Sequence, residues 1–258
     1  MIKMGTTQSL FVAGAIATVC VLGCKSVAEQ NSLGLSSDVE LRYSVLSVEE
    51  CVTLFPAGIW VDLLATKNIW ERFFELADKN SPDGGWIYEP GTLKSFPGGV
   101  YSQLASRCAF ANFEMEFDWS IATGANSGVK YLVDAEYGPV GLEYQILDDI
   151  SHPDAKIGPK RQAGALYDVV EAPVTKKLNP PGTVNHSRVM FKNGIGEHWL
   201  NGERLLTFDV SSADFAERVK ISKFKKMSFF GHNGSGQIML QHHGDAVTFT
   251  KLTVRALN

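Results

Sequence analysis

The sequence predicts an all-β domain built as a sandwich of two antiparallel sheets or a jelly roll, with little helix. Its 258 residues include 24 Gly, 10 Pro, 15 Phe, 5 Trp and 7 Tyr, a composition typical of strands and turns. Short segments alternate apolar and polar residues, and turn-forming pairs such as Asn-Gly separate them. Many short strands of this kind pack most readily as two sheets around one core.

The N-terminal residues 1–23 are interpreted as a lipoprotein signal peptide. A single Lys3 precedes an uncharged segment of about 13 residues, which is the size of a signal-peptide core and short for a membrane span. The segment ends in Gly23-Cys24, which resembles the bacterial lipobox, so Cys24 is the expected lipidation site. Lys25 instead of Asp follows, a pattern that favours the outer membrane. We therefore expect a lipid-anchored protein of the cell envelope, at the outer membrane or in the periplasm.

Residues 24–47 are polar and Ser-rich and predict a tether, followed by one domain over residues 48–258. Ile69, Phe73, Leu76 and Ala77 recur at helical spacing, which predicts a helix over 68–79. An exported protein can pair Cys51 with Cys108, but the sequence leaves this pairing open. Two buried free thiols are the simpler expectation.

The clearest strand covers 113–119, where four apolar side chains fall on one face and three carboxylates on the other, predicting one dry and one wet face. Asn201-Gly202 predicts a two-residue hairpin between 197–200 and 204–206. Further strands are expected at 129–133, 142–147, 189–191, 237–240 and 247–254.

The net charge of -4 argues against a protein that binds nucleic acid through its charge. The chain carries no P-loop, no Gly-x-Ser-x-Gly elbow and no Cys-x-x-Cys pair. No cofactor is required by the sequence, although a divalent metal is compatible with it. Two adjacent imidazoles, His242 and His243, and Asp245 are candidate zinc ligands, but neighbours on a strand point to opposite faces.

Polar side chains gather in four stretches beyond what a sandwich needs for folding. Lys130 interrupts an apolar strand, and alternation places Glu143 and Gln145 on one strand face, where they are suited to bind hydroxyls or hold a proton. Glu143 and Gln145 are explained equally well as polar residues on a solvent-exposed sheet face without a binding role. The other stretches, 163–168 and 240–245, contribute Tyr167 and the imidazoles.

In order along the chain, these stretches resemble the 3-keto-disaccharide hydrolase family. The matching segments are 110–114, 126–131, 141–149, 152–155, 165–168, 197–202 and 236–245. The resemblance implies a concanavalin A-like jelly roll with a saccharide cleft, acting on sugars already oxidised at C3. In that chemistry the ketone acidifies the C2 proton, a base removes it, the C1 aglycone leaves, and water adds to the 2-hydroxy-glucal. A separate sugar 3-dehydrogenase is then an expected partner, besides the saccharide substrate and the membrane.

Through this resemblance the candidate catalytic residues are Glu143 and His243, as base and acid in either order, with Asp148 helping to position them. The candidate substrate-binding residues are Asn126, Lys130, Gln145, Tyr167, Gln241 and Asp245. Lys130 and Asn126 are assigned to the C3 oxygen and the neighbouring hydroxyls.

Three other functions fit the same fold. A carbohydrate-binding module uses aromatic stacking without an acid or base. A glycosidase needs two carboxylates about 5–5.5 Å apart when it retains configuration, and Gln145 interrupts the matching motif. The third is a structural envelope lipoprotein.

Overall fold

The computed structural model describes residues 46–67, 74–76, 85–98 and 103–258. The signal peptide 1–23, Cys24 and nearly all of the expected tether lie outside the described residues. The helices are α2 (Val48–Leu54) and α4 (Ala213–Lys220), with 3-10 turns η1 (Ala135–Tyr137), η2 (Pro153–Lys156) and η3 (Pro159–Arg161). The strands are β1 (Val61–Asp62), β2 (Phe74–Leu76), β3 (Trp86–Glu89), β4 (Thr92–Ser95), β5 (Leu104–Phe110), β6 (Phe113–Ile121), β7 (Asn126–Val133), β8 (Leu142–Leu147), β9 (Asn185–Lys192), β10 (Ile195–Leu200), β11 (Glu203–Asp209), β12 (Gly236–His242) and β13 (Val247–Ala256).

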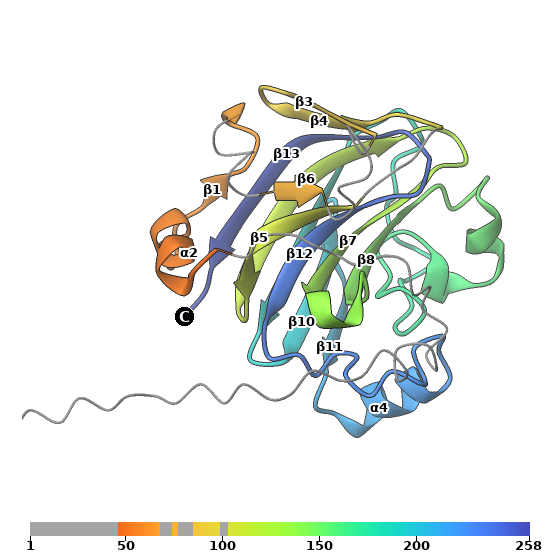
Figure 1. The fold of residues 1–258 in the computed structure, drawn as a ribbon. Helices are drawn as coiled ribbons and strands as arrows, with labels where there is room; N and C mark the ends of the chain where they lie inside the picture. The colour runs from red at the N-terminus through yellow and green to blue at the C-terminus, as the bar shows by residue number, and fades with distance from the viewer. Residues whose placement is uncertain (1–45, 68–73, 77–84, 99–102) are drawn as a thin grey trace, which may run out of the picture.

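Within the described residues, these strands form two antiparallel sheets that pack face to face (Figure 1). One sheet has the order β11-β10-β9-β6-β13-β4-β3, and β1 pairs with β13. The other has the order β2-β5-β12-β7-β8. The predicted jelly-roll sandwich is therefore confirmed.

Strand β6 shows how the alternation in the sequence builds the core. Its apolar side chains Phe113, Met115, Phe117 and Trp119 are almost completely buried between the sheets. The opposite face is less exposed to solvent than predicted, because Glu114 is only 3% exposed. Arg188 and Arg255 from the flanking strands form ion pairs with its carboxylate, which compensates the loss of water.

A polar network crosses the middle of this core. The fully buried His198 on β10 contacts the Tyr131 hydroxyl through Nε2 at 2.8 Å and the Gly164 carbonyl through Nδ1 at 3.0 Å. Trp119 Nε1 donates to Ser187 Oγ at 2.8 Å, and that hydroxyl also lies 2.8 Å from the Tyr144 hydroxyl. Burial lowers the pKa of His198 to about 4, so its imidazole is neutral at physiological pH.

The turns and short elements test the remaining expectations. Asn201 and Gly202 both have positive φ, 48° and 85°, as the predicted two-residue hairpin requires. The helix expected over 68–79 is wrong at Phe74–Leu76, which forms strand β2 and pairs with Leu104–Ser106 of β5. Pairing with an open sheet edge outweighs the helical spacing there. The other residues of that range fall outside the described part.

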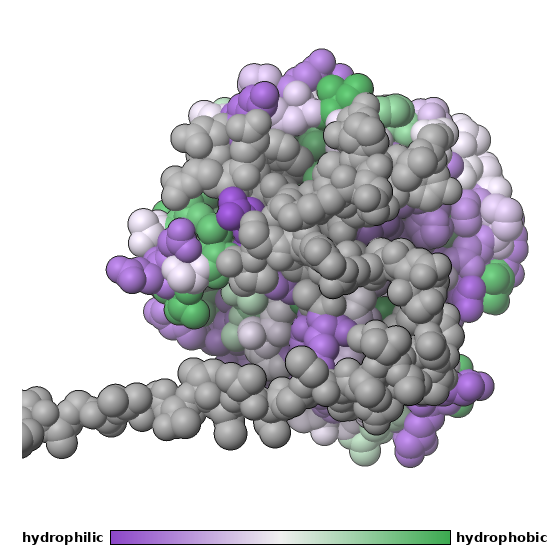
Figure 2. Space-filling model, viewed as in Figure 1, coloured by the Kyte–Doolittle hydropathy of each residue, from purple (hydrophilic) through white to green (hydrophobic). Residues whose placement is uncertain are grey.

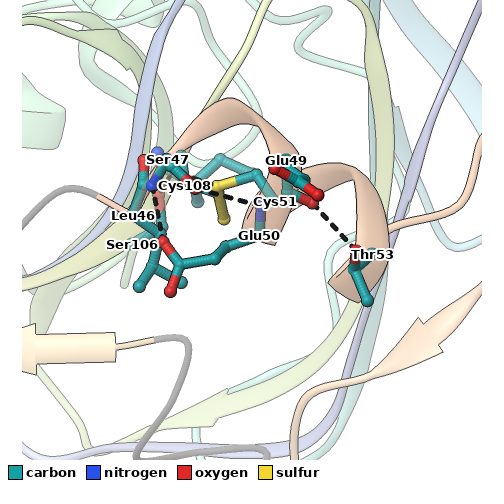
Figure 3. Close-up of a disulfide and its surroundings, with 9 residues drawn as sticks. Leu46, Ser47, Glu49, Glu50, Cys51, Thr53, Ser106 and Cys108 are labelled. Carbon is teal, nitrogen blue, oxygen red and sulfur yellow. Dashed lines mark hydrogen bonds between the residues drawn. A yellow bond between two sulfur atoms is a disulfide. The ribbon is translucent and has the colours of Figure 1, made fainter.

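The two cysteines expected as free thiols are instead joined. Cys51 of α2 and Cys108 of β5 form a disulfide with a Cα–Cα distance of 5.7 Å (Figure 3). Helix α2 starts at a capping box, in which Ser47 and Glu50 each accept a hydrogen bond from the other's backbone N–H. The disulfide therefore fixes the start of the described chain to the five-stranded sheet.

On the face that Figure 2 shows, hydrophobic residues gather over α2. Val48 and Val52 of α2 are 81% and 63% exposed. In the described part of the chain, neither helix has the length and apolar character needed to cross a membrane.

Candidate functional site

The candidate site lies on the face of the five-stranded sheet that points away from the core. In strands β7 and β8, Lys130 and Glu143 are directly paired residues, so their side chains stand next to each other on this face. Lys130 is 9% exposed and Glu143 is 5% exposed. Lys130 Nζ donates to the Pro139 carbonyl oxygen at 3.0 Å, which fixes the direction of the ammonium group. Burial lowers the pKa of Lys130, and the charge of Glu143 partly opposes this.

A glycine provides the space for the Glu143 carboxylate. Gly128 sits on β7, and a Cβ at this position would lie 2.6 Å from Glu143 Oε1. Among the described residues, no group donates a hydrogen bond to this carboxylate. Glu143 is therefore a buried carboxylate whose oxygens are available to a ligand.

Two amides flank the Lys130–Glu143 pair. Gln145 Nε2 donates to Asn126 Oδ1 at 3.0 Å, and Gln145 Oε1 is buried without a hydrogen-bond partner. Gln241 on β12 pairs with Gly128 in register, and its Oε1 is likewise buried and unsatisfied. Buried unsatisfied oxygens are costly, so hydroxyl donors of a ligand would stabilise both amides.

Two predicted acidic residues serve the backbone of the turns beside the site. The Asp148 carboxylate accepts hydrogen bonds from the backbone N–H groups of Gly124, Ile150 and Ser151. Although burial opposes it, these donors lower the pKa of Asp148. Asp245 Oδ2 accepts from the Asn126 backbone N–H at 3.0 Å. The structure thus gives Asp148 the role of holding the turn after β8.

The two histidines separate as alternation predicts. His242 is 2% exposed and packs edge-on against Trp86, with Nε2 3.2 Å from the Gly85 carbonyl oxygen. His243 lies beyond the end of β12 and is exposed. Partial enclosure lowers the pKa of His243, and Glu143 raises it while Lys130 lowers it further, so these three groups share one electrostatic environment.

Segment 163–168 runs along the edge of β8 and brings Tyr167 to the site. The Tyr167 N–H donates to the Glu143 carbonyl at 3.0 Å, and its hydroxyl donates to Asp154 Oδ2 at 2.8 Å. Arg161 joins Asp154 and Asp168 through ion pairs of 2.8 and 2.9 Å. Tyr167 is therefore held by a charged framework on the 152–168 segment.

Sequence reasoning missed Lys223. It lies after α4, and its Nζ stands 4.0 Å from the centre of the Tyr167 ring. Its pKa is lowered by burial, raised by Glu143 and lowered by Lys130, which places it in the same environment. In the sequence it belongs to a lysine-rich turn, 220–226, that reads as a solvated surface segment.

No three His, Cys, Asp or Glu side chains converge as a metal site in the part of the chain that the structure describes. The arrangement instead combines a buried carboxylate, a buried ammonium, an imidazole and two unsatisfied amides. These groups are suited to move a proton, stabilise a developing negative charge and bind hydroxyls.

The family model for the 3-keto-alpha-glucoside-1,2-lyase-like domain matches residues 64–255. The chain belongs to this family. It is also 31% identical, over a 288-residue alignment, to the 3-keto-disaccharide hydrolase of Bacteroides thetaiotaomicron, and the alignment covers 99% of this chain and 92% of that protein. The resemblance found in the sequence is thereby confirmed.

Two solved structures have a fold similar to that of this chain. A crystal structure of a putative glycosyl hydrolase from Parabacteroides distasonis matches with a TM-score of 0.61 and 27% identity, over 77% of this chain and 100% of that chain. A second from the same organism has a TM-score of 0.58 and 22% identity, over 78% of this chain and 100% of that chain.

Proposed function

We propose that the protein cleaves 3-keto-glycosides by elimination and hydration at the Lys130–Glu143 pair. The observation that carries this proposal is the Glu143 carboxylate, which is buried, has no hydrogen-bond donor among the described residues and stands beside a buried ammonium group. Family membership and the name of the Bacteroides relative support a keto-sugar substrate.

In the proposed reaction, Glu143 takes the proton from C2 of the 3-keto sugar. The electron pair of the broken C–H bond forms the enolate, whose oxygen is stabilised by the Lys130 ammonium. The enolate then expels the C1 aglycone, and the proton on Glu143 is available to the leaving oxygen. The products of this step are the free aglycone alcohol and a 2-hydroxy-glucal that still carries the C3 ketone.

His243 fits the hydration step. Because its lowered pKa keeps the imidazole mainly neutral at neutral pH, it can accept a proton from the water that adds to C1. A proton returns to C2, which completes a net hydrolysis. The amides of Gln145 and Gln241 would receive sugar hydroxyls on their unsatisfied oxygens.

The test incubates the purified protein with 3-keto-trehalose and with plain trehalose, with and without a chelator, and follows free glucose and 2-hydroxy-glucal. Release from the keto sugar alone supports the proposal, and loss of release with chelator adds a divalent metal to it. Glu143→Gln should abolish release, whereas His243→Ala should accumulate the glucal. Glu203→Gln, an exposed residue on β11, is the matched control. Saccharide binding without release would instead indicate a carbohydrate-binding module.

We further propose that this activity is anchored in the cell envelope through lipid on Cys24, and that an enzyme oxidising sugars at C3 supplies the substrate. The support is the lipobox-like sequence ending at Gly23-Cys24 and the ketone that the elimination requires. Labelling cells with a palmitate analogue should mark the wild-type chain and leave Cys24→Ser unmarked. Equal labelling of both would contradict the anchor.

A further inference from the structure

The ammonium group of Lys223 lies against aromatic rings. Among described side chains, no carboxylate lies within ion-pair distance of its Nζ. The group contacts aromatic faces instead, 4.0 Å from the ring centre of Tyr167 and 4.9 Å from that of Phe224. Such contacts attract a cation but do not neutralise it.

The neighbouring cations have polar partners. Lys130 stands opposite Glu143 in the strand register, and its Nζ donates to the Pro139 carbonyl oxygen. Arg161 is held by Asp154 and Asp168. Asp168 turns one oxygen to Arg161 and the other to the backbone N–H of Lys223, at 2.6 Å, and so fixes the main chain of Lys223 without contacting its ammonium group.

The position of Lys223 separates it from the reacting centre. Lys130 and Glu143 are buried against the sheet, whereas Lys223 keeps part of its surface exposed and has its ammonium group partly enclosed against the Tyr167 ring. A buried ammonium is suited to a charge that develops during reaction. A partly enclosed ammonium group on a residue with exposed surface is suited to a charge that the substrate already carries on the part projecting from the reacting sugar.

We propose that Lys223 is a substrate-binding residue that selects keto-glycosides whose aglycone carries an anionic group, such as a carboxylate, sulfate or phosphate. The inference rests on the proposed function for the reaction, and it adds the substrate class. Tyr167 supplies the flat surface that holds Lys223 in place, and the Asp154–Arg161–Asp168 framework holds Tyr167.

The test compares two 3-keto-glucosides that differ by one charge, those of 4-hydroxybenzoate and of its methyl ester. Lys223→Met keeps the apolar stem over Tyr167 and removes the charge. We expect KM for the carboxylate to rise about fivefold, as for a partly exposed ion pair, with kcat and the ester's KM nearly unchanged. Taking the ratio of variant to wild type for each compound removes the difference in leaving-group chemistry. Lys225→Met is the matched control, since Lys225 is an exposed lysine of the same turn.

Raising the salt concentration from about 0.02 to about 0.5 M should raise KM only for the compound that carries the carboxylate. Equal losses on both compounds, or none, would overturn the inference while leaving the proposed reaction intact. If the wild type cleaved neither compound, the result on 3-keto-trehalose would still decide the proposed function, and calorimetric binding of the two uncleaved glucosides would decide the inference. In that case, tighter binding of the carboxylate that depends on Lys223 supports the inference, and equal affinity overturns it.

Discussion

Replacing Gly128 by Ala should disable the site while leaving the fold intact. The new Cβ would lie 2.6 Å from Glu143 Oε1, whereas ordinary contacts start at 3.4 Å, so the carboxylate must move by roughly 0.8 Å. A displacement near 1 Å at a reacting group costs up to about 10²-fold in rate. We therefore expect kcat on 3-keto-trehalose to fall about 10- to 100-fold. The free energy of unfolding should change by no more than about 1 kcal/mol, because the carboxylate end can rotate and Ala suits a strand better than Gly.

The matched control is Gly234→Ala, where a Cβ meets nothing within 4 Å. Its turnover should equal that of the wild type. Stopped-flow or coupled assays of kcat, together with thermal unfolding, measure both quantities. Full activity in Gly128→Ala with an unchanged melting temperature would refute the assignment of Glu143 as the base.

Three further predictions concern stability. The pKa of His198 is about 4 in the folded protein against 6.5 in the unfolded chain, so the unfolded chain binds more protons between these pH values. The free energy of unfolding should therefore fall by up to about 3 kcal/mol as the pH drops from 6.5 toward 4. Urea unfolding of His198→Gln should lack this dependence on pH. Reducing the Cys51–Cys108 disulfide, or Cys51→Ser, should lower the free energy of unfolding by up to about 4 kcal/mol, since the bond closes a loop with a sequence separation of 57; an unchanged urea midpoint would contradict this. Glu114→Gln should cost about 2 kcal/mol, because it removes the buried partner of two partly exposed arginines, and calorimetric unfolding that matched the wild type would show that the ion pairs contribute nothing.

The strands and one face of the site could be predicted because alternation is a local property. Strand β8 spans 142–147 as expected, and Glu143 and Gln145 share the face that alternation gives them. The pairing of Lys130 with Glu143 depends on the register between strands β7 and β8. No local sequence pattern predicts that register. The sequence could propose both residues but not their pairing.

Other parts of the site depend on contacts between distant segments. Lys223 is separated from Tyr167 by more than 50 residues, and within its own turn it is one of several lysines. The strand at Phe74–Leu76 was hidden for the same reason, since only its pairing with β5 favours it over a helix. Pairing of Cys51 and Cys108 likewise required the distance between α2 and β5.

The segment beside β8 has a consequence for how the protein would be inactivated. Strand β8 is the last strand of its sheet, and an uncovered last strand is a template for aggregation. Here the backbone N–H groups of Gly164 and Tyr167 donate to the carbonyls of Gln145 and Glu143, and the Gln145 N–H donates to the Ala165 carbonyl. Detachment of this segment would therefore displace Tyr167 and, at the same time, expose the aggregation-prone edge of β8. Loss of activity on heating or storage should thus coincide with the first growth of light scattering.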